Sequence, residues 1–164
     1  MNMVLKCPGV TALCALALCA ATAEIRAQSL PSRPEWGVQG ALALTGGNDF
    51  GVGGRVRYPF RLSAPAPISA AADLNWFPGT GGSTFDLNWN LVYNFVPRGS
   101  ARPYAGGGIN LAIATGGAAS NTRLGLNGVG GFEFGRVGRL TPYLEGRYTF
   151  FSLRAFIVTF GVRF

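Results

Sequence analysis

The sequence predicts an all-β protein, an eight-stranded antiparallel up-and-down transmembrane β-barrel. Three observations lead to this fold class. Apolar and polar residues alternate with a period of two through eight successive segments. The apolar face of these segments carries most of the aromatic residues. Short connections join the segments, and no helical period separates them.

The eight predicted strands cover residues 36–45, 50–62, 68–76, 85–95, 104–113, 123–134, 140–150 and 155–164. The fourth has the clearest alternation, because Phe85, Leu87 and Trp89 alternate with Asp86 and Asn88. Each segment has about ten residues or slightly more, the length that a tilted strand needs to cross a bilayer. Short connections make consecutive strands antiparallel neighbours.

The two faces of the predicted sheet differ in bulk. The apolar face carries Trp36, Phe50, Tyr58, Phe60, Trp76, Phe85, Trp89, Tyr93, Phe95, Phe132, Phe134, Tyr148, Phe150, Phe156, Phe160 and Phe164. Side chains only just fit inside an eight-stranded barrel, so this bulk would overfill the lumen. The opposite face is rich in Gly, Ala, Ser, Asn and Thr. We therefore expect the apolar face to point outward, an arrangement that is stable in lipid.

The connections between the strands form two chemical sets. Residues 46–48, 79–84 and 116–121 are rich in Gly, Ser, Thr and Asn, whereas residues 61–67, 97–103 and 135–139 carry Pro and Arg. Alternate turns of an up-and-down barrel lie on the same rim, so each set is expected on one rim. With both termini in the periplasm, the Pro/Arg set would be periplasmic and the external loops short.

Residues 1–27 are predicted to be a secretory signal peptide, and residues 28–164 the barrel domain. Lys6 is followed by the apolar stretch 10–21, and cleavage sites end at Ala23 or at Ala27. All three cysteines lie in this segment: Cys7, Cys14 and Cys19. The mature chain would therefore have no disulfide, thiolate nucleophile or cysteine metal site.

Composition excludes several classes of chemistry. The sequence has no histidine, which disfavours Ser or Cys hydrolases and His-ligated metal sites. The formal net charge is +7, but the arginines are spread singly, so a nucleic-acid-binding patch is not expected. No catalytic residue, cofactor or metal site is predicted.

Charged residues at inward positions form the candidate site. They are the four cations Arg55, Arg57, Arg123 and Arg147 and the four anions Asp73, Asp86, Glu133 and Glu145. Isolated buried ions are costly, so these groups are expected to pair. Neighbouring strands suggest that Glu133 and Glu145 meet Arg147, and that Arg55 or Arg57 meets Asp73. The network is interpreted as a static plug; the alternative is a gate whose pairs exchange.

Several segments resemble the small outer-membrane barrels of the OmpA/OmpX-like, or opacity-protein-like, group. They are residues 102–110, 130–134, 140–148 and the final strand 156–164. The resemblance implies an outer-membrane location after export through the periplasm. It also implies that the barrel-assembly machinery recognises the final strand through Phe160, Val162 and Phe164. The chain departs from many members of the group in lacking long external loops.

These observations predict a non-enzymatic integral outer-membrane protein with a structural role in the cell envelope. One alternative is a narrow, porin-like channel or transporter for ions or small solutes. Another is a secreted, soluble, lipocalin-like barrel that binds a ligand. The expected partners are outer-membrane lipid and lipopolysaccharide, which Arg123 and Arg154 near the external rim could contact, and the assembly machinery. The sequence specifies no solute and no oligomeric state.

Overall fold

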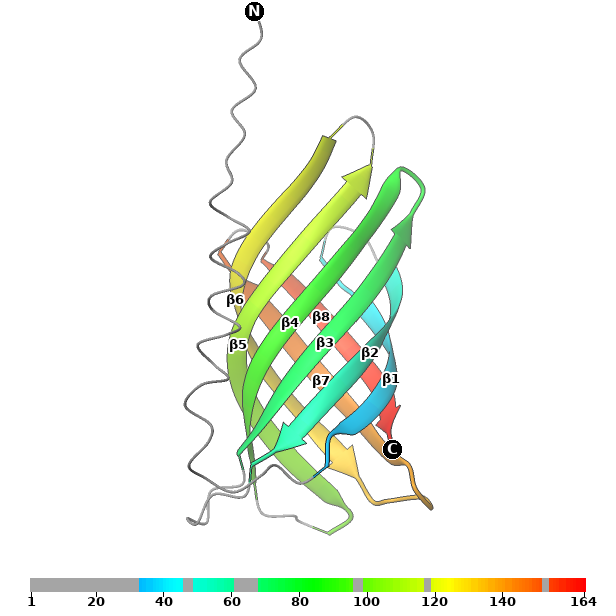
Figure 1. Ribbon diagram of the computed structural model, residues 1–164, viewed down its shortest axis with the longest axis vertical. Coiled ribbons are helices and arrows are strands. Elements are labelled where there is room, and N and C mark those ends of the chain that lie inside the picture. The colour runs from blue at the N-terminus through cyan, green and yellow to red at the C-terminus, as the bar shows by residue number, and fades with distance from the viewer. Residues whose placement is uncertain (1–32, 46–48, 61–67, 96–98, 117–118, 152–153) are drawn as a thin grey trace, which may run out of the picture. The chain divides into compact units, whose positions relative to one another are not determined.

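Eight antiparallel strands form a closed barrel in the computed structural model, which describes residues 33–45, 49–60, 68–95, 99–116, 119–151 and 154–164 (Figure 1). The strands are β1 (Glu35–Ala43), β2 (Asp49–Pro59), β3 (Ile68–Gly79), β4 (Gly82–Asn94), β5 (Ala101–Gly116), β6 (Ala119–Phe134), β7 (Thr141–Phe150) and β8 (Ala155–Arg163). Each strand pairs with the next, and β8 pairs with β1. The predicted eight-stranded up-and-down topology is confirmed. The predicted signal peptide lies outside the described residues.

None of the residues that the structure describes belongs to a helix long and apolar enough to cross a membrane.

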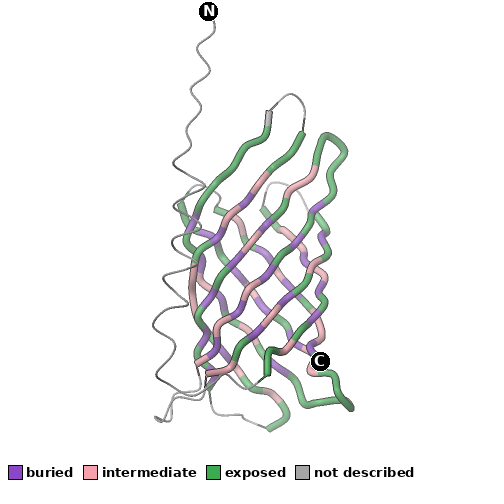
Figure 2. The backbone as a smooth tube through the Cα atoms, in the orientation of Figure 1, coloured by how far each residue is buried: buried purple, intermediate pink, exposed green. Residues whose placement is uncertain are grey.

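Burial alternates along most of the barrel wall, whereas the ends of β5 and β6 toward the Gly-rich turns are exposed at successive residues (Figure 2). The aromatic residues predicted for the apolar face are exposed on the outside, apart from Phe60, which is half-buried. The interior instead buries Asn, Asp, Glu and Arg side chains. The predicted orientation of the two faces is therefore correct. An outward apolar face argues against the lipocalin-like alternative, because a soluble barrel has its apolar face inside.

Two bands of aromatic side chains surround the barrel near its ends. One lies toward the Pro/Arg turns and includes Trp36, Tyr58, Tyr93, Phe95, Phe134 and Phe164. The other lies toward the Gly-rich turns and includes Phe50, Trp76, Phe85, Tyr148, Phe150 and Phe156. Within the bands, Tyr93 packs edge-on against Phe95 with ring centroids 5.0 Å apart. Such bands are typical of barrels whose ends lie at membrane interfaces.

Inward glycines make room for large side chains on the neighbouring strand. Tyr104 pairs in register with Gly131, and Tyr143 pairs with Gly161. A Cβ added at Gly131 would lie 2.7 Å from the Tyr104 ring and 2.4 Å from the carbonyl oxygen of Leu144. Alternating small and large inward residues is how a narrow barrel fills its interior.

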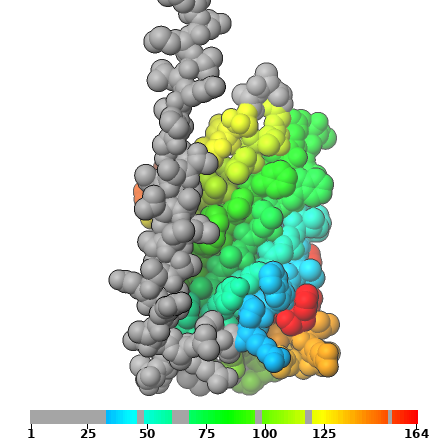
Figure 3. All heavy atoms as spheres, in the orientation of Figure 1, coloured from blue at the N-terminus to red at the C-terminus, as the bar shows by residue number. Residues whose placement is uncertain are grey.

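The barrel wall has unequal heights. Strands β5 and β6 have 16 residues each, whereas β1 and β8 have 9. The pairing of β6 with β7 ends at Leu126 and Phe150, so residues 119–125 of β6 continue beyond β7. The β3–β4 and β5–β6 hairpins therefore project past the rest of the barrel, as the green and yellow regions at the top of Figure 3 show.

Candidate functional site

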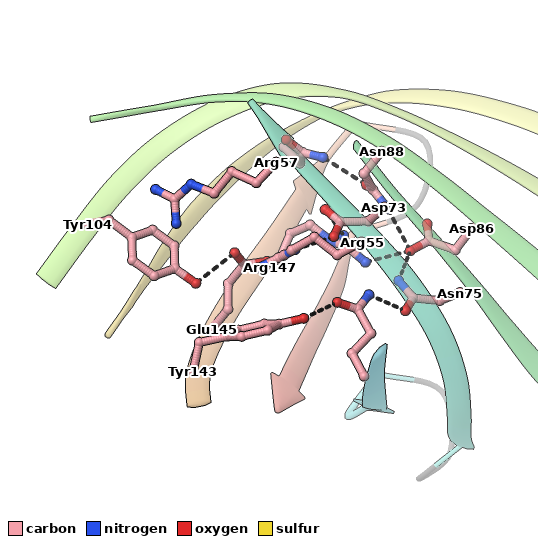
Figure 4. A network of polar contacts seen from close by, with 12 residues as sticks. Arg55, Arg57, Asp73, Asn75, Asp86, Asn88, Tyr104, Tyr143, Glu145 and Arg147 are labelled. Atoms are coloured by element: carbon pink, nitrogen blue, oxygen red, sulfur yellow. Dashed lines mark hydrogen bonds and ion pairs between the residues drawn. The ribbon is translucent and has the colours of Figure 1, made fainter. Parts of the chain in front are cut away.

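The first ion-pair cluster lies in the middle of the lumen and centres on Arg55 of β2. Its Nε donates to Asp73 of β3, and its Nη2 donates to Glu145 Oε1 of β7 at 2.6 Å. The hydroxyl of Tyr104 donates to the other oxygen of Glu145 at 3.0 Å (Figure 4). The Arg55 guanidinium also lies over the Tyr143 ring, 4.6 Å from its centroid. One arginine thus joins both sides of the barrel.

The second cluster centres on Asp86 of β4. Arg147 Nη2 donates to its Oδ2 at 2.5 Å, and the side-chain amides of Asn75 and Asn88 donate to the same oxygen (Figure 4). The side-chain amide of Asn110 donates to Asp86 Oδ1. Arg147 Nη1 lies 4.0 Å from Asp73 Oδ2, which connects this cluster to the first. Arg147 is completely buried, with 0% of its surface exposed. Three side-chain amides and one guanidinium therefore donate hydrogen bonds to the buried Asp86 carboxylate in place of water.

The third cluster lies at the end of the lumen near the Pro/Arg turns. Arg57 donates to Glu133 and to Asn94, and Arg163 Nη2 forms an ion pair with the same Glu133 oxygen at 2.8 Å. Arg163 Nη1 also donates to Glu35 Oε2 at 2.6 Å. Two guanidinium groups thus share one buried carboxylate, and the second carboxylate is only half-buried.

The structure corrects the predicted network in its fourth cation. Arg123 is exposed and makes no ion pair with any described residue, whereas Arg163 is buried and paired. Arg123 lies on the part of β6 that extends beyond the end of β7, opposite Ala112 of β5. Arg123 is therefore outside the filled part of the lumen. Arg163 continues the inward alternation of Ile157 and Thr159 on β8, and this spacing is the sequence signal for the fourth cation. Four cations still face four buried anions.

The predicted pairing is also partly wrong. Arg55 meets Asp73 on the adjacent strand, as expected. Glu133 pairs with Arg57 and Arg163 rather than with Arg147, and Glu145 pairs with Arg55. The lumen is narrow enough for arginine side chains to reach across it, so adjacent strands do not determine the partners.

Uncharged polar residues complete the network, and sequence reasoning did not single them out. Tyr143 donates to Gln39 Oε1 at 2.5 Å, and Gln39 Nε2 donates to Asn75 Oδ1 at 2.6 Å. Asn127 donates to Asn88 Oδ1 at 2.9 Å. The inward run of asparagines along β4 was a usable signal, because amides at these positions need partners when buried.

An apolar cluster packs inside the barrel toward the Gly-rich turns, on strands β1, β3 and β8. It consists of the buried residues Ala41, Phe77 and Ile157, with Ala43 packed against them. We call it the apolar cap. The alternation of β3 extends to Phe77, which lies one residue beyond the predicted third strand. Apolar side chains at this level offer ions no replacement for their water of hydration.

The opposite end of the lumen is hollow. A cavity of about 460 Å³ opens between the Pro/Arg turns, with Arg57, Glu133 and Arg163 at its floor. The acidic groups of the network are paired with arginines. Within the part of the chain that the structure describes, no group of three or more metal-ligating side chains occurs.

The residues of the predicted assembly signal lie at the seam where the barrel closes. Phe160 and Phe164 are exposed on the outer surface, and Val162 is half-buried. The backbone N–H of Phe164 donates to the carbonyl of Trp36 at 2.8 Å, and Trp36 N–H donates back at 3.3 Å. The last residue therefore belongs to the ladder that joins β8 to β1.

Comparison with solved structures supports the barrel fold. The N-terminal β-barrel domain of Pseudomonas aeruginosa OprF superposes with a TM-score of 0.59 at 15% identity, covering 82% of this chain and 98% of that one. Neisserial surface protein A gives 0.56 at 18% identity, covering 79% and 94%. Ail of Yersinia pestis gives 0.58 at 12% identity, covering 79% and 93%.

No family model matches the chain, and no curated protein matches it in sequence. At these identities the structural likeness concerns the fold. The chain thus has the closed eight-stranded architecture of the small outer-membrane barrels.

Proposed function

We propose that the chain is an integral outer-membrane protein of the OmpA/OmpX-like kind, with a structural and non-enzymatic role in the envelope. The observation that carries the proposal is the inverted distribution of side chains. Arg147, Asn88 and Thr159 are fully buried inside, while Leu91 and Trp36 are 61% and 54% exposed outside. Such a surface is stable in a hydrocarbon layer and would aggregate in water.

The contents of the lumen favour a barrel that is blocked to ions over a channel. Its charges are balanced and paired, and the apolar cap lies beyond them. Rearranging the pairs would leave buried ions without partners, at a cost of several kcal/mol for each ion. We therefore propose that the barrel does not conduct ions.

The surface also suggests the partners of the barrel. Arg123 and Arg154 are exposed on the rim of the Gly-rich turns, where guanidinium groups could bind lipopolysaccharide phosphates. We propose that the assembly machinery recognises the outward side chains of β8, including Phe160, Val162 and Phe164.

Two measurements test the proposal. Purified outer membranes are run on SDS gels with and without boiling, and a band that shifts on boiling is expected from a lipid-embedded barrel. The same protein is then reconstituted into planar bilayers, where no stepwise ion conductance is expected. A soluble protein without a band shift would overturn the membrane location, and discrete conductance steps would support the channel instead.

A further inference from the structure

The cavity at the Pro/Arg end of the lumen has the composition of an anion-binding site. Among the residues that the structure describes, four arginines line it, Arg57, Arg102, Arg136 and Arg163, against two glutamates, Glu35 and Glu133. The buried part is nearly neutral, because Arg57 and Arg163 share Glu133 and Arg163 also binds Glu35. The excess positive charge therefore lies with the arginines at the mouth.

Arg102 and Arg136 make no ion pair with the residues that the structure describes. Both are exposed and both line the cavity. Arg102 lies in register with Glu133, at an inward position of β5. Arg136 lies in the β6–β7 connection, where Val137 and Leu140 exchange two backbone hydrogen bonds of 2.9 and 3.1 Å. The backbone thus holds both cations at the entrance.

The buried arginines keep hydrogen-bond donors for a ligand. A guanidinium has five N–H groups, and the hydrogen bonds and ion pairs of Arg57 and Arg163 use two nitrogens on each. Arg57 and Arg163 are 5% and 4% exposed, so they are held in place rather than free to move. Fixed guanidinium groups in a partly enclosed site favour oxyanions such as phosphate, which accept several hydrogen bonds at once.

We propose that this cavity binds a phosphate group, either as a free anion or on the headgroup of an anionic phospholipid. Phe60, Ile68 and Phe134 lie at the edge of the cavity, beside the outer apolar surface, where the neighbouring part of a lipid would lie. The proposal does not depend on the membrane location or on the closed lumen, because the chemistry of the cavity is the same in detergent. Failure to bind phosphate would leave the proposed function in place.

Calorimetric titration of the folded protein in zwitterionic detergent with sodium pyrophosphate tests the site. Saturable binding of one anion per chain is expected, above a sodium chloride control of equal ionic strength. Arg102→Gln and Arg136→Gln should each weaken binding about tenfold, the effect of losing one charge-assisted hydrogen bond. Arg139→Gln is the matched control, because Arg139 is exposed in the same connection but does not line the cavity.

A second experiment distinguishes the two possible ligands, the free anion and the headgroup of an anionic phospholipid. The protein is reconstituted into nanodiscs of phosphatidylcholine with or without phosphatidylglycerol, and the titration is repeated. If the headgroup is the ligand, phosphatidylglycerol should suppress pyrophosphate binding at least tenfold; if the free anion is the ligand, both nanodiscs should bind equally. The proposal is wrong if no saturable binding occurs in detergent, or if Arg139→Gln weakens it as much as Arg136→Gln.

Discussion

Replacing Arg147 with methionine removes the most deeply buried cation of the lumen while keeping much of its volume. Asp86 then loses its ion pair, and Asp73 loses the weaker contact at 4.0 Å. We expect Arg147→Met to lower the free energy of unfolding, because it leaves a buried carboxylate without its counter-charge.

The contacts of Asp86 indicate how much unfolding free energy Arg147→Met should remove. Removing one partner of a buried ion pair typically costs about 3–5 kcal/mol. Asp86 would keep the amide donors of Asn75, Asn88 and Asn110, which partly replace the lost hydrogen bond. We therefore expect Arg147→Met to lower the free energy of unfolding by about 3 kcal/mol, the lower end of that range. The double variant Arg147→Met/Asp86→Asn removes both charges and should be more stable than the sum of the single changes by about 1–3 kcal/mol.

The assay is equilibrium urea unfolding of the barrel in lipid vesicles, followed by tryptophan fluorescence and by the shift of the band on unboiled gels. Arg123→Met is the matched control, because the same substitution on the exposed rim should change stability by less than about 0.5 kcal/mol. Additive effects in the double variant would refute the pairing of Arg147 with Asp86. Equal losses from Arg123→Met and Arg147→Met would refute the assignment of Arg123 to the rim.

Three further changes probe the wall and the lumen by the same unfolding assay. Tyr104→Phe removes the hydroxyl that donates to Glu145 and should cost about 1.5 kcal/mol; an unchanged midpoint would contradict this contact. Gly108→Ala places a Cβ 1.8 Å from a main-chain oxygen and should abolish the folded band, whereas Gly81→Ala, with nothing within 4 Å, should fold normally. Ile109→Arg, in register with Trp89 midway between the aromatic bands, should cost about 2–4 kcal/mol in lipid; a neutral effect would argue against lipid contact there.

Local sequence patterns were sufficient for the wall of the barrel. Side chains along a strand alternate with a period of two, so the positions of Asp86 and Asn88 on one face follow from their spacing. The direction of that face follows from volume, since the aromatic face is too bulky for an eight-stranded lumen. Short connections then leave an antiparallel meander as the expected topology. None of these inferences requires knowledge of distant contacts.

The contacts inside the lumen were determined only by the closed barrel. Arg57 and Glu133 are 76 residues apart in sequence and meet across the lumen, and Arg163 rather than Arg123 completes the charge balance. Phe77 and Ile157 pack in one apolar cluster, although they come from separate parts of the chain. The alternation of residues along a strand predicts which side chains point inward. The register and tilt of the strands determine the height of each side chain, that is, its position along the barrel axis. Height determines which inward side chains meet, and it is a property of the whole closed sheet rather than of any one strand.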